Sequence, residues 1–249
     1  MPVDFVRGLT GRHRTADNNR WLGLALAFTA GAINAGGYLA VKQYTSHMTG
    51  IVSAMADNLV LGQATLVLAA AAALATFIAG AMTTAIVVNW GLRRRMHSAY
   101  SLPLLLEAVV LLVFGLLGAS LGLHTALLVP VTVLLLCFMM GLQNAVISKI
   151  SRAEIRTTHV TGLVTDLGIE LGKLVYFNRI DGVGPVRASR ERMRTQGLLI
   201  GLFFVGGVVG ALGFQVAGYI TTLPLALMLL MLSLRPVLFD MGALARPAT

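Results

Sequence analysis

Charged residues and cysteine are scarce in this sequence. Only 12% of its 249 residues are Asp, Glu, Lys or Arg, whereas soluble domains carry roughly 25%. Its single cysteine, Cys137, lies in an apolar run, so an intrachain disulfide is excluded and a small core side chain is expected. The scarcity of charge argues against a soluble globular domain.

Familiar catalytic motifs are also missing. The sequence contains no Walker loop, no dinucleotide glycine fingerprint, no zinc-protease helix and no nucleophile elbow. We therefore expect a protein that is not an enzyme, is not driven by ATP, and holds neither a cofactor nor a metal ion.

Long apolar runs dominate the sequence instead. It is 57% hydrophobic with a mean hydropathy of +0.82, and six runs approach the roughly 20 residues that cross a bilayer as a helix. These runs are residues 21–41, 64–90, 102–121, 126–148, 197–218 and 219–234. We predict a single all-α polytopic membrane domain, residues 1–249, whose first run is an uncleaved span rather than a signal peptide.

The excess of basic residues fits a membrane protein. The net charge of +9 could suggest a nucleic-acid partner, but the basic residues lie at the ends of the apolar runs, where the positive-inside rule puts them. We expect the lipid bilayer and a small-molecule or ion solute as partners, and no nucleic acid. The basic residues 178–195 are expected to form a cytoplasmic connector.

One short polar motif occurs twice. Residues 45–53 read Thr-Ser-His-Met-Thr-Gly-Ile-Val-Ser, and residues 157–165 read Thr-Thr-His-Val-Thr-Gly-Leu-Val-Thr. A Gly-x-x-Asn-Ala element precedes each copy, with its asparagine at Asn34 and Asn144. A duplicated polar motif in so apolar a chain is typical of solute transporters, whose sites lie at repeat interfaces.

Further matches extend the duplication in the same order along the chain. Phe77, Gly80 and Thr84 match Phe203, Gly206 and Gly210, and Leu-Pro-Leu occurs at both 102–104 and 223–225. The small residues of these pairs predict close helix packing within one chain, and a homo-oligomer contact is a second option.

The basic residues distinguish two topologies. If the motif segments 48–62 and 160–176 both span, the chain has eight helices and a parallel repeat; if neither spans, it has six helices and an inverted repeat. Six spans leave only Lys42 outside, whereas eight would also move the arginine cluster 93–95 outside. We predict six spans as a 3+3 inverted repeat in a bacterial inner membrane, with both termini cytoplasmic.

The predicted repeats have approximate bounds. Repeat 1 covers about residues 21–123 and repeat 2 about residues 124–238, and residues 1–20 and 239–249 are cytoplasmic tails. The two motif segments are short helices that can re-enter the membrane, lie on its surface or span it. Thr45 or Ser46, and Thr157 or Thr158, are the expected N-cap residues.

Re-entrant motif helices would direct two helix N-termini, with their free N–H groups and partial positive charge, at a common midplane. The residues expected to bind substrate there are His47, Thr49, Gly50, Ser53, Asn34, His159, Thr161, Gly162, Thr165 and Asn144. The two histidines have three alternative roles: metal ligation, solute or proton contact, and structural capping. No further Cys or His with ligand spacing surrounds them, since His13, His97 and His124 fall in expected loops.

Three acidic residues are candidates for proton coupling or for polar contacts inside the membrane. They are Glu107, Asp57 and Asp166. Glu107 is the only formally charged residue inside the six apolar runs, and a carboxylate at that depth is a functional candidate by default. Asn34 and Asn144, with Gln143, either line the cavity or bond between helices.

The motifs resemble the YoaK family of small bacterial inner-membrane proteins, whose domain is of unknown function. The resemblance rests on Gly-Ala-Ile-Asn-Ala at 31–35, on Gly-Leu-Gln-Asn-Ala at 141–145 and on the two Thr-Gly motifs, and it covers about residues 23–234. The family pattern has Asp in place of Asn34 and Asn in place of Ile51. The resemblance implies a bacterial membrane location and no particular substrate.

Three functional hypotheses follow from the sequence. The first is a secondary transporter or channel for a small solute, with its site between the inverted repeats. The second is a membrane-embedded enzyme that uses His47 and His159 as acid and base, which requires both in one cavity with a carboxylate in reach. The third is a non-transporting scaffold or lipid-interacting protein, which predicts a packed interior without a polar cavity.

Overall fold

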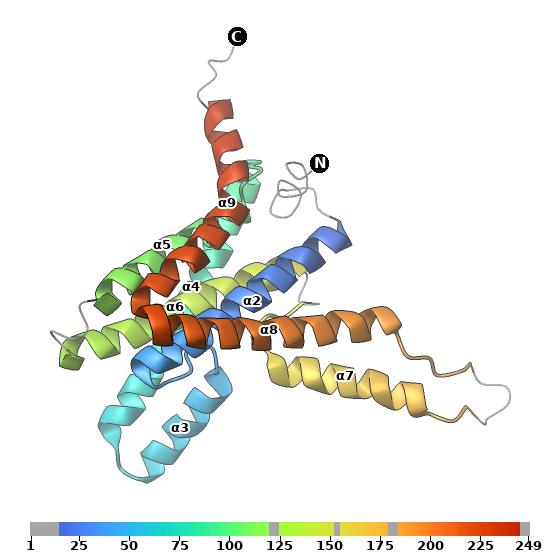
Figure 1. Cartoon of the computed structure of the whole chain (residues 1–249), viewed down its shortest axis with the longest axis horizontal. Helices are drawn as coiled ribbons and strands as arrows, with labels where there is room; N and C mark the ends of the chain where they lie inside the picture. Colours follow the sequence, from blue (N-terminus) through green and yellow to red (C-terminus); the bar gives the residue numbers. More distant parts are fainter. Residues whose placement is uncertain (1–14, 120–124, 152–154, 179–183, 245–249) are drawn as a thin grey trace.

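All the regular elements that the structure describes are helical, as Figure 1 shows. The computed structural model describes residues 15–119, 125–151, 155–178 and 184–244. The elements are α2 (Ala16–Val41), α3 (Met48–Val60), α4 (Ala64–Arg93), α5 (Ser101–Ala119), α6 (Thr125–Ser151), α7 (Val160–Val175), α8 (Arg190–Ala217), the 3-10 turn η1 (Gly218–Thr221) and α9 (Thr222–Leu244). His13 and His124 lie outside the described residues.

Five helical stretches of the described chain are long and apolar enough to cross a membrane. They are Asp17–Val41, Ala64–Arg93, Ser101–Gly118, Val129–Ser151 and Arg190–Met241. The prediction of an all-α fold is therefore confirmed, and these stretches are consistent with a polytopic membrane protein. The last stretch, of 52 residues, contains two of the six predicted runs, which η1 separates.

The long helices associate in three pairs. α2 lies against α8, α4 against α6, and α5 against α9. Each pair joins a helix of the first half of the chain to one of the second half, so neither half forms a separate bundle. The largest hydrophobic cluster combines residues of α2, α5, α6 and α9, with Leu26, Leu111, Met140 and Leu229 among its fully buried members.

Glycines allow two of these pairs to approach backbone to backbone. A Cβ on Gly31 of α2 would lie 2.0 Å from the Phe203 carbonyl oxygen, and one on Gly141 of α6 would lie 2.0 Å from that of Phe77. Helices this close need residues without side chains at the crossing.

The partner helices α8 and α4 also have a glycine at each crossing. A Cβ on Gly206 of α8 would lie 2.0 Å from the Phe28 carbonyl oxygen, and one on Gly80 of α4 would lie 2.0 Å from that of Phe138. The prediction that these small residues serve packing within one chain is confirmed. The α2–α8 and α4–α6 crossings thus use equivalent residues of the two halves.

Polar contacts hold several helix ends together on one side of the bundle. The side-chain amide of Asn19, near the start of α2, donates to the Ile150 carbonyl near the end of α6 (3.5 Å). Lys149 of α6 donates to the Asn89 side-chain oxygen near the end of α4 (3.1 Å). The start of α2 and the ends of α4 and α6 therefore lie close to one another.

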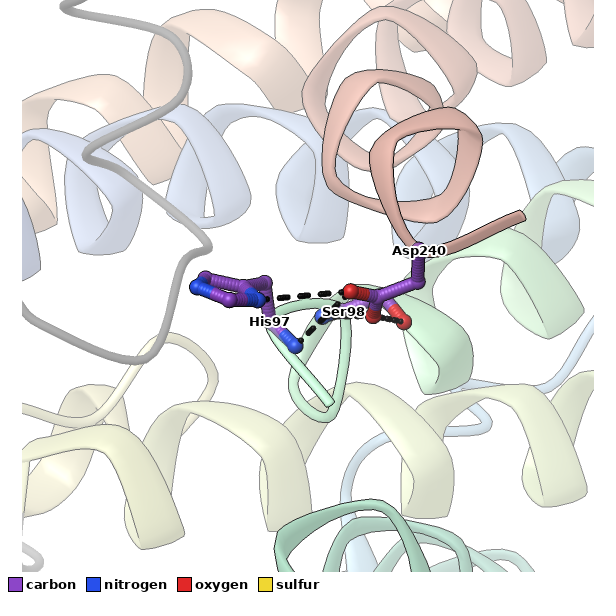
Figure 2. A network of polar contacts seen from close by, with 3 residues as sticks. All are labelled: His97, Ser98 and Asp240. Carbon is purple, nitrogen blue, oxygen red and sulfur yellow. Dashed lines mark hydrogen bonds and ion pairs between the residues drawn. The ribbon is translucent and has the colours of Figure 1, made fainter. Parts of the chain in front are cut away.

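Asp240 of α9 adds a further helix end to this side. Its carboxylate accepts hydrogen bonds from the Ser98 N–H (2.8 Å), the Ser98 hydroxyl (2.6 Å) and the His97 N–H (3.2 Å), and His97 Nδ1 lies 3.4 Å away (Figure 2). His97 and Ser98 form the turn between α4 and α5. Asp240 thus fixes the end of α9 to that turn.

The expected end of the connector was wrong. The connector predicted to extend to residue 195 ends earlier, because Ser189 caps α8 by accepting from the Arg192 N–H (3.3 Å), and Glu170 of α7 accepts from the Ser189 N–H (2.7 Å). The tail predicted from residue 239 begins as helix, because α9 continues to Leu244 and its Asp240 is held by the α4–α5 turn.

Candidate functional site

The two motif helices begin at the same place in the bundle. α3 starts at Met48 and α7 at Val160, and both starts line a cavity of about 740 Å³. In Figure 1 the two helices run away from this point in different directions, α3 beside α4 and α7 beside α8. The motif copies, more than a hundred residues apart in sequence, therefore face each other across one space.

This space, the central cavity, has a mixed lining. The residues that line it are Asn34, Tyr44, Ser46, His47, Met48, Thr49, Phe77, Arg156, Thr158, His159, Val160, Thr161, Gly162 and Phe203. Phe77 and Phe203 come from near the middle of α4 and α8. The polar groups come mainly from the two motif copies and the segments that lead into them.

Matching hydrogen bonds fix the two segments that lead into the motif helices. The Ser46 hydroxyl donates to Asn34 Oδ1 (2.8 Å), and the Thr158 hydroxyl donates to Asn144 Oδ1 (2.5 Å). Asn144 also donates to the Met140 carbonyl of its own helix (2.8 Å). Each asparagine of the Gly-x-x-Asn-Ala element thus anchors the segment before the following motif helix.

The predicted N-caps were wrong, because two of the expected capping hydroxyls bond asparagines instead. His47 and His159 are the N-cap residues, and neither side chain makes a capping hydrogen bond. Ser46 and Thr158 are occupied by the asparagines, while Thr45 and Thr157 are buried one residue earlier, with hydroxyls that have no partner among the described residues. The amides at both helix starts are therefore left without a side-chain cap.

Uncapped amides give the central cavity a donor-rich lining. The first helical hydrogen bonds are from the Ile51 N–H to the His47 carbonyl and from the Leu163 N–H to the His159 carbonyl, both 3.1 Å. The Met48 N–H donates to the Ser46 carbonyl (3.2 Å), whereas the other amides that precede Ile51 and Leu163 in each helix have no carbonyl one turn back to bind. Such a helix start favours an anion or a polar solute.

Arg156 is the one permanently charged residue in this lining. Its guanidinium lies near the start of α7, since a Cβ on Gly162 would be 3.3 Å from Nη1. In the described residues, Arg156 has no carboxylate within ion-pair distance.

A second cavity of about 590 Å³ adjoins the first. It lies among the end of α2, the motif helix α3 and the starts of α4 and α6, and its lining includes Lys42, Gly50 and Asn58. Tyr44 and His47 line both cavities, and the Tyr44 ring stacks on Tyr38 at 4.5 Å. We call this space the side cavity. Tyr44 and His47 form its boundary with the central cavity.

The expected substrate-binding residues divide into three groups. Asn34, His47, Thr49, His159, Thr161 and Gly162 line the central cavity, and Gly50 lines the side cavity. Asn144 is buried behind the central cavity, where it holds Thr158. Ser53 and Thr165 lie one turn further along α3 and α7, where both are exposed.

The three acidic candidates lie away from the cavities. Asp57 and Asp166 are exposed on α3 and α7. Glu107 is fully buried in α5, and neither carboxylate oxygen has a hydrogen-bond partner among the described residues. Gln143 bonds between helices, donating to the Leu26 carbonyl of α2 (3.3 Å).

Sequence reasoning missed Arg156 and Tyr44 as lining residues. Each immediately precedes its copy of the motif, so the alignment of the two copies could have found them as an equivalent pair. In the described part of the chain, no group of three or more His, Cys, Asp or Glu side chains is placed to hold a metal ion.

Comparison with known proteins supports a membrane protein. Residues 22–234 match the family described as "Protein of unknown function (DUF1275)". The UPF0700 transmembrane protein YoaK of Bacillus subtilis (strain 168) is 27% identical over 191 residues, which cover 75% of this chain and 80% of that protein. No solved structure matches the chain. The resemblance drawn from the motifs is confirmed.

Proposed function

We propose that this chain, which belongs to the DUF1275 family, is a secondary transporter or channel that moves a small solute through the central cavity. The observation that carries this proposal is the meeting of two copies of one polar motif at a single cavity of about 740 Å³. A polar cavity between repeats, reached by helix N-termini, is the arrangement in which many transporters bind their substrates.

The proposal includes six spans arranged as a 3+3 inverted repeat. The long stretch Arg190–Met241, at 52 residues, is far longer than the roughly 20 residues of one span, and η1 divides it into two helices that are each long enough to cross. The reciprocal glycine crossings of α2 with α8 and of α4 with α6 support the equivalence of the halves.

The distribution of charge supports opposite orientations of the halves. The start of α2 and the ends of α4, α6 and α9 lie on one side of the bundle, next to Arg20, Arg93, Lys149 and Arg235. Lys42 is at the other end of α2. By the positive-inside rule the basic side is cytoplasmic. Both termini would therefore lie on the cytoplasmic side of a bacterial inner membrane.

Helix lengths support re-entry of both motif helices. α3 has 13 residues and α7 has 16, which correspond to about 20 and 24 Å at a rise of about 1.5 Å per residue. Each therefore covers about half of a bilayer with its headgroups. α3 would lead from the midplane to the outer surface and α7 from the midplane to the cytoplasm, so their starts would meet at mid-depth.

We propose transport rather than catalysis or scaffolding. The acid–base hypothesis needs a carboxylate in reach of His47 and His159, and the described lining of the central cavity contains none. The scaffold hypothesis predicts a packed interior without a polar cavity. The two adjoining cavities argue against that hypothesis. The side cavity, which Lys42 helps to line, would form the outer vestibule.

The threonines of the two motifs test the proposal. We expect the double variant Thr49→Val, Thr161→Val to lose most solute uptake in proteoliposomes, by about tenfold or more, because two polar contacts in the cavity disappear. The matched control is Thr76→Val, Thr83→Val, whose hydroxyls bond only carbonyls of their own helix (2.9–3.0 and 2.8 Å). Full uptake by the first variant would refute a solute path through the motifs.

A further inference from the structure

The charge of the central cavity has one sign among its described lining residues. Arg156 contributes a full positive charge, and no aspartate or glutamate is present in the lining. In the first copy of the motif the residue equivalent to Arg156 is Tyr44, since Tyr-Thr-Ser-His stands where the second copy has Arg-Thr-Thr-His. The duplication alone therefore does not require a cation at this position.

Arg156 is an exposed side chain at a position where a helix start disfavours a cation. Its guanidinium lies near the start of α7, and the start of a helix carries about half a positive charge. The helix start therefore disfavours the Arg156 cation, and an anion in the cavity would offset that repulsion.

The shape of the cavity suggests what kind of anion fits. Arg156 and those first amides of α3 and α7 that lack a carbonyl partner supply donors for an oxyanion, and an arginine fork matches the two oxygens of a carboxylate. Phe77, Phe203 and Val160 supply apolar lining. A volume of about 740 Å³ exceeds what a lone inorganic ion needs and lies in the range typical of small-molecule sites.

We propose that the central cavity binds a small organic carboxylate, with its head group on Arg156 and the start of α7 and its body against the two phenylalanines. The inference rests on the proposed transport function and names its substrate class. Arg156 is then the residue that determines specificity for an anion over a neutral or cationic solute.

Binding and uptake test the inference separately. Binding is measured as the rise in Tm of the detergent-purified protein in sodium lactate or sodium succinate, compared with sodium chloride at equal ionic strength. Uptake is measured in proteoliposomes with radiolabelled lactate, succinate, choline and erythritol. The variants are Arg156→Gln, Arg156→Lys and the control Arg187→Gln, which removes an exposed arginine of the connector.

We expect a carboxylate to raise Tm and to be taken up. Arg156→Gln should lower the affinity obtained from the Tm shift, and the uptake, by about tenfold, the usual scale for losing a charged hydrogen bond. Arg156→Lys should retain part of both effects, and Arg187→Gln all of them. An unchanged Tm of Arg156→Gln without ligand would show that the variant is folded.

The remaining outcomes separate the two proposals. Uptake of choline or erythritol, without any effect of lactate or succinate, would overturn the carboxylate site and leave transport standing. A carboxylate-dependent rise in Tm that requires Arg156, without uptake of any of the four solutes, would support the site and refute transport. No effect of either carboxylate on Tm or uptake would overturn the inference.

Discussion

At the scale of single residues, Glu107 and Glu170 are two buried carboxylates in opposite situations. Glu107 has no hydrogen-bond partner among the described residues. Glu170 accepts from Lys173 (2.8 Å) and from the Ser189 N–H (2.7 Å). The Lys173 hydrogen bond foremost, and then that of Ser189, lower the pKa of Glu170. Its stabilising contribution is therefore complete above pH 4.5, its ordinary pKa, and is lost as the pH falls through the lowered value.

The glutamine substitutions should therefore differ in their effect on stability. We expect Glu107→Gln to leave stability unchanged or to raise it by about 1 kcal/mol, since a buried carboxylate without partners is costly. Glu170→Gln should destabilise the α7–α8 hairpin, because the ion pair with Lys173 disappears. Thermal unfolding in detergent compares the two variants. If Glu107→Gln were the more destabilising, Glu107 would have a stabilising partner.

Single residues also mark what the sequence could and could not predict of the site. Thr49 and Thr161, His47 and His159 were predicted from the duplication alone, and all line one cavity. The capping prediction failed because Ser46 and Thr158 bond asparagines 12 and 14 residues earlier in the chain. A preference for local caps cannot anticipate such a tertiary contact. Arg156 was not predicted as a site residue, because a topology count assigns every basic residue to a membrane surface.

At the scale of helices, backbone contact at two crossings holds the halves together. The crossings of α2 with α8 and of α4 with α6 are closed by Gly31 and Gly141, whose positions lie against the carbonyls of Phe203 and Phe77. The same crossings place Phe203 and Phe77 at the central cavity. Closeness of the helices and the shape of the site therefore depend on the same glycines.

Alanine at these glycines should force the helices apart. We expect Gly31→Ala and Gly141→Ala each to cost about 3 kcal/mol or more, because a Cβ 2.0 Å from a carbonyl oxygen cannot be accommodated by moving a side chain. The matched control is Gly168→Ala in α7, where a Cβ meets nothing within 4 Å and alanine favours helix by about 0.5–1 kcal/mol. Thermal unfolding in detergent measures all three, and wild-type stability of the crossing variants would contradict the close packing.

Most helices could be predicted from hydropathy, but their boundaries could not. The apolar runs 64–90 and 102–121 correspond to α4 and α5, because an apolar run must satisfy its backbone polar groups by forming a helix in lipid. The start of α8 at Arg190 was missed, since a basic, glycine-rich segment is typical of a loop. That start depends on the Ser189 cap and on Glu170 from another helix.

At the scale of the whole molecule, the proposed inverted architecture holds an asymmetric site. Corresponding helices of the two halves make corresponding contacts. The residue before each motif breaks the symmetry, with Tyr44 at the boundary to the side cavity and Arg156 near α7. In the proposed architecture, equivalent halves would permit two related conformations, as in known transporters with inverted repeats, while the unlike residues give the cavity its charge.

The inverted orientation of the halves is the claim on which the shared site depends. Two exposed positions report on it: Gln63, between α3 and α4, and Arg187, between α7 and α8. The only cysteine, Cys137, is buried beside Ile51 and Ala73, so Cys137→Ala gives a background without thiols. Gln63→Cys and Arg187→Cys are introduced singly and treated with a membrane-impermeant maleimide in bacterial cells.

We predict that Gln63→Cys is labelled in intact cells, and that Arg187→Cys is labelled only after the membrane is permeabilised. The two positions would then open to opposite compartments, with α3 and α7 entering the membrane from opposite sides. Labelling of both positions in intact cells, or of neither until permeabilisation, would contradict the inverted repeat, since the two motif helices would then enter from the same side.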